Sequence, residues 1–398
     1  MGKKSYKQTK MFADYQSSIS NEKIGHFSFK SIHTEIKHLI LRECIKQSAI
    51  VANYFAKLDK IPSKNGQIKR YCYLDFYAGQ GMFDDGQNGS PLIALETVNK
   101  HMTCIPVSFV FCEKDKASYD SLNSITKDEK NVDCFCGAWR ENSQQIFGAF
   151  HVSQWGFAFV DPFDNFKTKE EFDMLIDFFS QTTLKDMLFF FNIQALKRMF
   201  TDYRQQVLNL FSATEEDIDR AEHFSDGIFS KLVLAKAKKM KKKFIDGAAI
   251  PNSTNDKLND SNAFYMMLVT NSSGVIFPFY EAYAKTLEQY KKCQQTSLFP
   301  QISTGDKILS ILSSSFIGLS DLSKQLLSEF VGWKETNSID MLPTKDNICN
   351  AINNLIKDGR VQIHFTEDGN KYVDKSGLLR KTAFSSNRAL ENIAIAKL

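Results

Sequence analysis

The sequence lacks the signatures of several large functional classes. Its eight cysteines include no Cys-x-x-Cys pair, so the ligand spacing of a structural zinc site is absent. No stretch approaches the ~20 consecutive apolar residues of a membrane-spanning helix. Neither the Gly-x-Ser-x-Gly of serine hydrolases nor the Gly-x-x-x-x-Gly-Lys-Ser/Thr of P-loop enzymes occurs. We therefore expect no metal site, no membrane partner, and reduced thiols in a cytoplasmic protein.

A strong charge of either sign is also absent. The net charge is +4, from 50 Lys and Arg against 46 Asp and Glu, which by itself does not identify a nucleic-acid-binding protein. What is present is an ordinary globular composition of 398 residues, 43% of them hydrophobic. Such a chain is long and apolar enough to form two or three domains with a large core.

The pattern along the chain predicts an α/β domain. Residues 1–33 are polar and basic and are expected to form an N-terminal arm. From 34 to 300, short apolar runs alternate with helical segments, which is typical of a mostly parallel sheet with helices on both faces. The expected strands are 71–76, 107–112, 132–136, 157–160 and 187–192. Residues 264–270 and 275–279, joined by Asn-Ser-Ser-Gly, predict a hairpin at the sheet edge, and 200–260 reads as an insertion.

Residues 303–398 predict a small C-terminal winged-helix domain and a tail. Three helices are expected, beginning near Asp306, Ser320 and Thr344. A hairpin of 360–365 with 371–373 then follows around Glu-Asp-Gly-Asn. Such domains use their third helix to read DNA. Here that helix balances two lysines with two aspartates, so contact with a protein or with nucleic acid both remain open.

The first candidate site follows the first strand. Asp75 ends the strand and leads into Tyr77-Ala-Gly79-Gln-Gly81. Glycines let a backbone turn sharply and approach a ligand closely. The dinucleotide fingerprint needs a third glycine, and Asp84 stands at that position, so a dehydrogenase is the weakest interpretation. A Gly-x-Gly pair alone is also compatible with an ordinary turn.

Two acidic residues follow later strands. Glu113 ends the second strand, where a carboxylate can bind both ribose hydroxyls of an adenosine cofactor. The sequence Asp161-Pro162-Phe163 follows the fourth strand and matches the Asp-Pro-Pro-Tyr type of site. There, carboxylate and carbonyl oxygens accept the two protons of an exocyclic amine and an aromatic ring stacks on the flipped base. Each motif alone also fits a plain strand end, but together they face one crevice of a parallel sheet.

These motifs resemble the three-Cys-motif partner proteins, a bacterial family with S-adenosylmethionine-dependent methyltransferase character. The resemblance lies in Lys37-His38 to Leu41, Tyr73–Gly81, Gly89-Ser90-Pro91, Phe111–Asp115 and Phe159–Phe163. It covers residues 33–200 well and 201–300 loosely, and the family often carries a C-terminal winged helix. A more distant likeness is to ribosomal-RNA adenine methyltransferases that begin with a Lys-His helix. The expected fold is therefore a Rossmann-like methyltransferase sheet with S-adenosylmethionine as cofactor.

The resemblance also implies roles for particular residues. Asp161, Pro162 and Phe163 would be catalytic. Nine residues would line the cofactor site: Lys37, His38, Asp75, Tyr77, Gly79, Gly81, Ser90, Glu113 and Ala138. His38 would close over the cofactor, and Ser90 would bind its methionine carboxylate. Ala138 stands where related enzymes often have an Asp for the adenine, and Trp139 beside it could stack instead. Gln80 and Asp164 also depart from the usual family residues.

Nucleic-acid contacts are expected from two further groups. Lysines 231–243 form a run without an acid, which fits either a solvated helix face or a strip that contacts phosphates. The candidates in this run are Lys238, Lys239, Lys241, Lys242 and Lys243. Asn192 and Gln194 follow the fifth strand, where their amides could read a base edge or satisfy loop backbone.

Two functions remain open at this point. The first is methylation of an adenine exocyclic amine in RNA or DNA, with a three-Cys-motif partner protein and a role in phage defence. The second is a catalytically silent, cofactor-binding scaffold that docks a partner, which the departures at Gln80, Ala138 and Asp164 favour.

Overall fold

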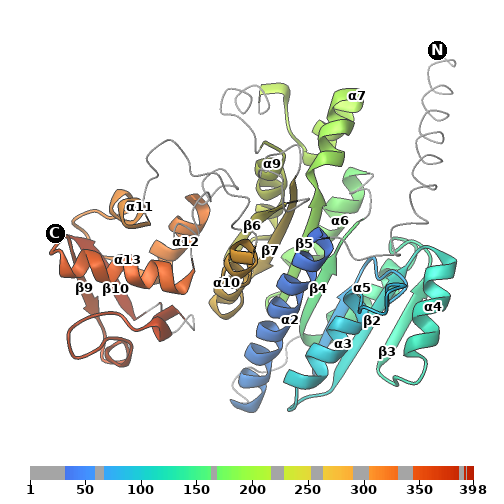
Figure 1. Cartoon of the computed structure of the whole chain (residues 1–398), viewed down its shortest axis with the longest axis horizontal. Coiled ribbons are helices and arrows are strands. Elements are labelled where there is room, and N and C mark those ends of the chain that lie inside the picture. Colours follow the sequence, from blue (N-terminus) through green and yellow to red (C-terminus); the bar gives the residue numbers. More distant parts are fainter. Residues whose placement is uncertain are drawn as a thin grey trace.

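A central sheet of seven strands organises the larger part of the chain (Figure 1). The computed structural model describes residues 32–58, 67–162, 168–216, 228–251, 263–289, 304–329, 344–384, 390 and 392–398. Residues 1–31 of the predicted arm, and the predicted Phe163 and Asp164, lie outside these ranges. Among the described residues, no helix is both long and apolar enough to cross a membrane. No group of metal-binding side chains is found among them either.

The sheet has the strand order β3-β2-β1-β4-β5-β7-β6, with β7 antiparallel to both neighbours. The strands are β1 Ile68–Asp75, β2 Val107–Glu113, β3 Val132–Cys136, β4 Ser153–Val160, β5 Lys185–Asn192, β6 Phe244–Pro251 and β7 Ala263–Thr270. The first five are parallel. This is the predicted Rossmann-like sheet, and all five predicted parallel strands are confirmed.

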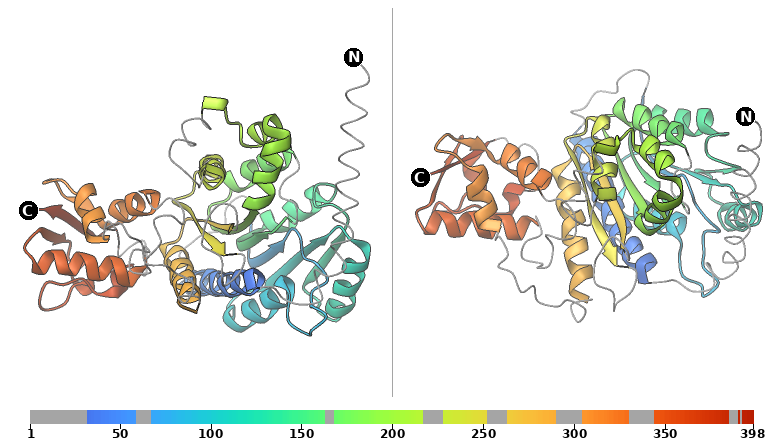
Figure 2. Two further views of the ribbon diagram at one scale, coloured as in Figure 1. Left: turned by 45° about the horizontal axis from the view of Figure 1, so that its top comes forward. Right: turned by 90° about the horizontal axis from the view of Figure 1, so that it is seen from above.

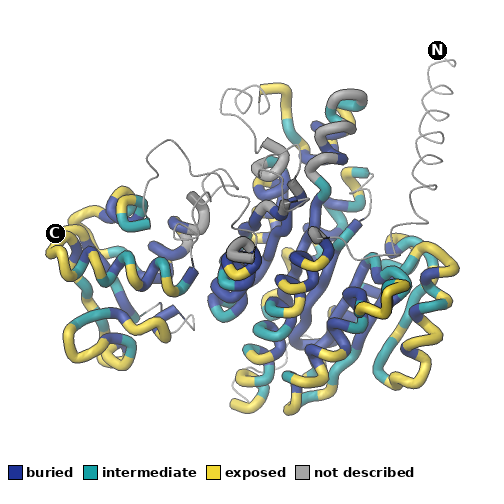
Figure 3. Tube along the Cα trace, in the orientation of Figure 1, coloured by how far each residue is buried: buried dark blue, intermediate teal, exposed yellow. Residues whose placement is uncertain are grey.

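Helices cover both faces of the sheet, as the alternating pattern predicts (Figure 2). One face packs on α2 Ile32–Leu58, α3 Ser90–His101, α4 Lys116–Thr126 and α10 Ser273–Gln289. The other packs on α5 Ser143–Val152, α6 Lys169–Ser180, α7 Ile193–Phe211 and α9 Ile228–Ala237. Successive strand residues point to opposite faces, so Tyr71 and Tyr73 enter the first core and Cys72 and Leu74 the second. The central strands β4 and β5 are buried along almost their whole length, whereas the edge strand β3 is only partly buried (Figure 3).

The predicted hairpin of 264–270 with 275–279 is wrong. Strand β7 pairs instead with β6, from the segment expected to be an insertion, and 275–279 belong to helix α10. The Thr270 hydroxyl accepts the Ser272 N–H at 2.9 Å. The Ser272 carbonyl accepts the N–H groups of Val275 and Ile276, at 3.1 and 3.2 Å, which begins the helix. A short apolar run suits a buried helix as well as a strand, and its periodicity does not distinguish them.

The C-terminal residues form a second, smaller unit. It contains α11 Thr304–Ile311, β8 Ile317–Gly318, α12 Leu319–Glu329, α13 Lys345–Lys357, β9 Val361–Phe365 and β10 Ile393–Lys397. The antiparallel sheet has the order β8-β10-β9. The three predicted helices are confirmed, but β9 pairs with β10 and not with 371–373. Residues Asn370–Tyr372 instead form a 3-10 helix, and Val373 makes an isolated bridge to Leu379. The winged-helix assignment itself stays a prediction.

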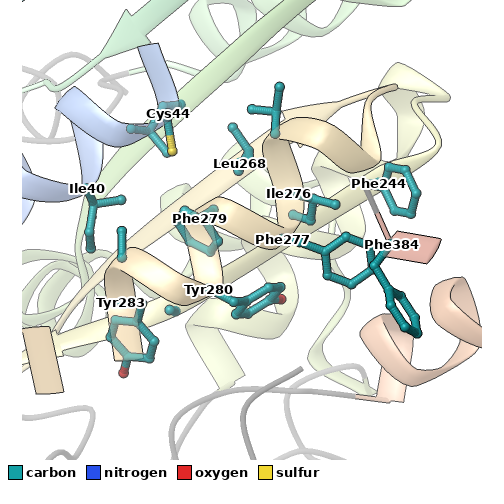
Figure 4. Close-up of a cluster of buried hydrophobic side chains, with 14 of the residues drawn as sticks. Ile40, Cys44, Phe244, Leu268, Ile276, Phe277, Phe279, Tyr280, Tyr283 and Phe384 are labelled. Atoms are coloured by element: carbon teal, nitrogen blue, oxygen red, sulfur yellow. The ribbon is translucent and has the colours of Figure 1, made fainter. Parts of the chain in front are cut away.

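The smaller unit lies against helix α10 of the larger one (Figure 4). The rings of Phe277 and Phe384 meet edge to face with centroids 5.5 Å apart. Lys345, the first residue of α13, reaches Glu281 at 3.9 Å. Helix α12 also contacts β6, the last strand of the large sheet. An otherwise unpaired strand edge is thereby covered, which protects it from pairing with another chain.

Candidate functional site

Three acidic side chains lie at the carboxyl edge of the parallel strands, on one face of the sheet. Asp75 ends β1, Glu113 ends β2, and Asp161 follows β4. In the sheet register Asp75 pairs with Phe111 on one side and Phe159 on the other. Phe111 and Phe159 belong to the first core, and Glu113 and Asp161 follow them by two residues. The three acids therefore have the same parity along their strands as these aromatic residues. All three side chains thus project toward the face covered by α2 and α3.

The glycine loop after β1 is bonded to the neighbouring strand β2. The Ala78 N–H donates to the Cys112 carbonyl at 2.9 Å. The Gly79 N–H donates to Glu113 Oε2 at 2.7 Å. Gly79 and Gly81 have φ of 66° and 85°, which glycine adopts without strain. A Cβ on Gly81 would lie 2.9 Å from a Leu122 methyl group. The loop therefore needs glycine at this point, both for its backbone and for space.

The Glu113 carboxylate joins this loop to the start of α4. Its Oε1 accepts the Asp115 N–H at 2.7 Å, while its Oε2 accepts from Gly79. Burial raises the pKa of Glu113. A carboxylate has about four lone-pair positions, so two backbone bonds leave acceptor capacity for a further ligand. The arrangement is compatible with the predicted contact to a ribose diol.

Asp75 is fully buried between its strand, the glycine loop and α3. It accepts hydrogen bonds from the Tyr73 hydroxyl at 3.3 Å and the Tyr77 N–H at 3.2 Å. Burial raises the pKa of Asp75 to about 7. Hydrogen bonds to the carboxylate lower it in part, and the one from the Ser90 side chain has the largest effect. Ser90 was expected to bind the methionine carboxylate of a cofactor. The structure places it at the start of α3, beside Asp75.

Asp161 forms an ion pair with Lys37 of helix α2. Both side chains are mostly buried, at 19% and 11% exposed. The Lys37 ammonium also lies 4.7 Å from the ring centroid of Phe190 on β5. Lys37 was predicted to contact the cofactor, but the structure brings it to the predicted catalytic carboxylate. Pro162, the next residue along the chain, is buried.

His38 occupies the next position of α2 and contacts the segment after the glycine loop. It is buried, and its ring lies 6.0 Å from that of Phe83. This position is compatible with the predicted closure over the cofactor site. Neither this packing nor the role of Tyr73 was predicted from the sequence. Tyr73 could have been found, since it lies two residues before Asp75 and therefore on the same face.

The segment after β3 completes the edge beside Glu113. The Gly137 N–H donates to the Glu113 carbonyl at 3.0 Å, and the Ala138 N–H to Glu141 Oε2 at 3.1 Å. Trp139 is 3% exposed and donates its indole N–H to the Tyr77 hydroxyl at 2.9 Å. Trp139 belongs to the second core, so the structure does not support its stacking on a cofactor. Its hydrogen bond fixes the side chain of Tyr77.

Of the residues predicted to contact nucleic acid, Asn192 lies at this edge of the sheet, at the end of β5, and the lysines do not. The Asn192 side chain accepts the Ala195 N–H at 3.0 Å and caps α7, so it satisfies backbone. The side chain of Gln194 lies outside the described residues. The five lysines come directly before β6, whose first residue Phe244 pairs with Thr270. Thr270 is the last residue of β7, and the opposite end of β7, at Phe264, pairs with Asn192. The lysines therefore lie at the opposite edge of the sheet from Asp161.

Lys242 does not belong to an exposed strip. It is 9% exposed, and its ammonium donates to the Thr182 carbonyl, to the Thr182 hydroxyl at 3.1 Å and to the Lys185 carbonyl at 3.4 Å. Burial lowers the pKa of Lys242 to about 8. Its predicted phosphate contact is therefore wrong, because the ammonium is already used inside the protein.

No family model and no curated protein matches the chain. Among solved structures, one similar chain is a Legionella pneumophila protein of the DUF519 family, at 12% identity and TM-score 0.37. That alignment covers 64% of this chain and 93% of the other.

Two further structures come from streptococci. A putative S-adenosylmethionine-dependent methyltransferase from Streptococcus mutans is 10% identical, with TM-score 0.26, over 55% of this chain and 47% of that one. The methyltransferase subunit of a type I restriction-modification system from Streptococcus thermophilus is 11% identical, with TM-score 0.28, over 64% and 53%.

Proposed function

We propose that the chain is an S-adenosylmethionine-dependent methyltransferase that modifies an exocyclic amine of adenine in RNA or DNA. The observation that carries this proposal is the common edge of three strands. It presents Asp161 with Pro162 next to a glycine loop that is bonded to Glu113. This layout supports a methyl donor and an amine acceptor side by side, at the crevice where such sheets bind their ligands.

The residues at this edge of the sheet fit the adenosine part of the cofactor. Gly79 and Gly81 leave backbone without a Cβ in the way, and Glu113 keeps acceptor capacity for two hydroxyl groups. We propose that these three residues and the backbone of Ala138 hold the adenosine part. Asp75, Tyr77, Ser90 and His38 would form the wall of the methionine part.

The cofactor supplies the electrophilic methyl group, and the protein supplies orientation. Asp161 Oδ and the Pro162 carbonyl would accept the two amine protons, so that the nitrogen lone pair is directed at the methyl group. Asp161 or water would take the proton that is released. Lys37 would keep the carboxylate in place until the amine arrives. Stacking of the base on Phe163 belongs to this proposal as well.

A second candidate is a cofactor-binding scaffold without methyl transfer. The Lys37–Asp161 ion pair favours it, because the ammonium occupies an oxygen that the substrate amine would need. In either case we propose a three-Cys-motif protein as partner, contact through the C-terminal unit as a winged helix, and action in the bacterial cytoplasm against phage. Methyl transfer by the chain together with its partner would exclude the scaffold.

The first experiment is calorimetric titration with S-adenosylmethionine and its demethylated product. We expect micromolar binding by the wild type and a loss of at least about tenfold in Glu113→Ala, because two hydroxyl contacts of roughly 1 kcal/mol each are removed. Glu129→Ala, at an exposed position, is the matched control and should bind normally. Equal affinity in wild type and Glu113→Ala would contradict the site assignment. No binding at millimolar ligand would require the test to be repeated with the partner protein.

A further inference from the structure

Three lysines stand at the edge of the sheet opposite to the candidate site. Lys238 and Lys239 lie in the 3-10 helix η1 Lys238–Met240, and Lys241 follows it before β6. All three are exposed. Among the described residues, none of them has a hydrogen bond or an ion pair to an acidic side chain. We call these three residues the lysine edge.

The backbone that carries the lysine edge is held firmly. Lys241 has a φ of 55°, and its N–H donates to the Lys238 carbonyl at 3.1 Å. On the following side, the Lys242 ammonium is anchored to the Thr182 carbonyl, and the Lys243 N–H donates to Asn271 Oδ1 at 2.7 Å. A charged surface on a fixed backbone loses less conformational entropy when it binds a ligand.

Two acidic side chains near the lysine edge have partners of their own, and Asp246 also interacts electrostatically with Lys238. Lys236 of α9 uses Asp173, at 2.9 Å, and the Leu210 carbonyl. Asp246 of β6 accepts a hydrogen bond from Tyr280, and burial raises its pKa well above the usual range. The first carboxylate is thus already paired, and the second is buried and hydrogen-bonded to a tyrosine. Within the described part of the chain these three exposed ammonium groups form no ion pair, so they can contact an anionic partner.

The chemistry of this surface favours nucleic acid over a membrane. Peripheral membrane helices combine basic residues with an exposed apolar face. Among the described residues, α9, η1 and β6 carry no exposed large apolar side chain. Clustered lysines without an apolar neighbour bind a phosphate backbone by charge alone and independently of sequence.

We propose that the lysine edge is a second, sequence-independent contact for the phosphate backbone of the nucleic-acid substrate, remote from the base that is methylated. The eight residues of β6 separate the two sheet edges by on the order of 25 Å. A duplex covers that distance in about seven base pairs. The substrate must therefore extend at least that far beyond its target base to reach the lysine edge. This inference rests on the proposed function in that the substrate is a nucleic acid.

The test is equilibrium binding of fluorescent duplexes to the full chain without cofactor. Hairpin duplexes of 5 and 30 base pairs, in RNA and in DNA, are titrated at several salt concentrations, for wild type and for the triple variant Lys238→Glu, Lys239→Glu, Lys241→Glu. We expect the wild type to bind the long duplex more tightly. In the triple variant this advantage should be lost, and the slope of log affinity against log salt should fall by about 2 to 3. The control is Lys100→Glu, Lys127→Glu, Lys130→Glu, which changes net charge equally at exposed positions elsewhere.

The outcomes separate this inference from the proposed function. Equal length and salt dependence in wild type and triple variant would overturn the inference and leave the methyltransferase proposal intact. An equal loss in both triple variants would also overturn it, because net charge alone would then explain binding. Lysine-dependent binding to phosphatidylserine vesicles but not to duplexes would replace nucleic acid by a membrane surface. Cofactor affinity, measured in parallel, reports on the proposed function and on folding of both variants.

Discussion

A single substitution at Asp161, which pairs with Lys37, should affect methyl transfer without affecting cofactor binding. Asp161→Asn keeps the shape of the side chain but removes the charge that would orient the amine and accept its proton. We expect the affinity for S-adenosylmethionine to change little and the rate of methyl transfer to fall by about 10²–10³. Single-turnover transfer to nucleic acid, with the partner protein present, measures this rate.

Cofactor binding by Asp161→Asn serves as the folding control, because Lys37 loses its charged partner in this variant. Asp133→Asn, at an exposed position of β3, is the matched substitution and should transfer methyl groups at the wild-type rate. An undiminished rate in Asp161→Asn would show that the amine is oriented by another group.

Asp75 predicts a pH dependence of stability. Burial raises its pKa to about 7 in the folded protein, whereas an unfolded chain releases this proton near pH 4. Between these values the folded state binds more protons, so the contribution of Asp75 to the free energy of unfolding falls as pH rises from about 4 to about 7. Asp75→Asn should therefore lose less stability than wild type between pH 5 and 8 in urea unfolding. Parallel curves for the two proteins would contradict a buried, protonated Asp75.

At the scale of elements, the sequence predicted those parts of the fold that local pattern determines. The five parallel strands are apolar runs between helical segments, and the ends of these runs were enough to place Asp75, Glu113 and Asp161 at one edge. Strand β6 was missed because it lies in a lysine-rich region and is recognised only by its pairing with β7. The first turns of helix α10 were predicted as a strand, because residues 275–279 are a short apolar run.

The contacts that the sequence did not predict are those that join distant segments. Lys37 and Asp161 are 124 positions apart, and no spacing rule connects them. The position of the lysine edge also depends on the direction of β6. Because antiparallel β7 lies between β5 and β6, β6 runs the same way as the five parallel strands, and the lysines that precede it stand at the edge where those strands begin. The partner of β9 was also not predicted, since β9 pairs with β10 and not with residues 371–373. Pairing partners are set by tertiary packing, which local pattern does not record.

At the scale of the whole molecule, the C-terminal unit depends on its contact with α10. Phe384 is fully buried, and its ring meets that of Phe277. Phe384→Ala should cost about 3–5 kcal/mol, because a large buried ring is removed and a cavity remains. This loss of stability weakens the packing between the two units and the packing within the smaller unit. We therefore expect the C-terminal unit to unfold at a lower temperature than the large sheet in scanning calorimetry.

Phe316→Ala is the matched control, since Phe316 belongs to the same unit but is 50% exposed. It removes the same atoms without opening a buried cavity, so its melting profile should stay close to that of wild type. If Phe384→Ala melted like Phe316→Ala, the packing against α10 would contribute little to the stability of the smaller unit. If both parts of Phe384→Ala melted together at a lower temperature, the two units would form one cooperative structure. A partner bound to the C-terminal unit would then act directly on the stability of the sheet that carries the site.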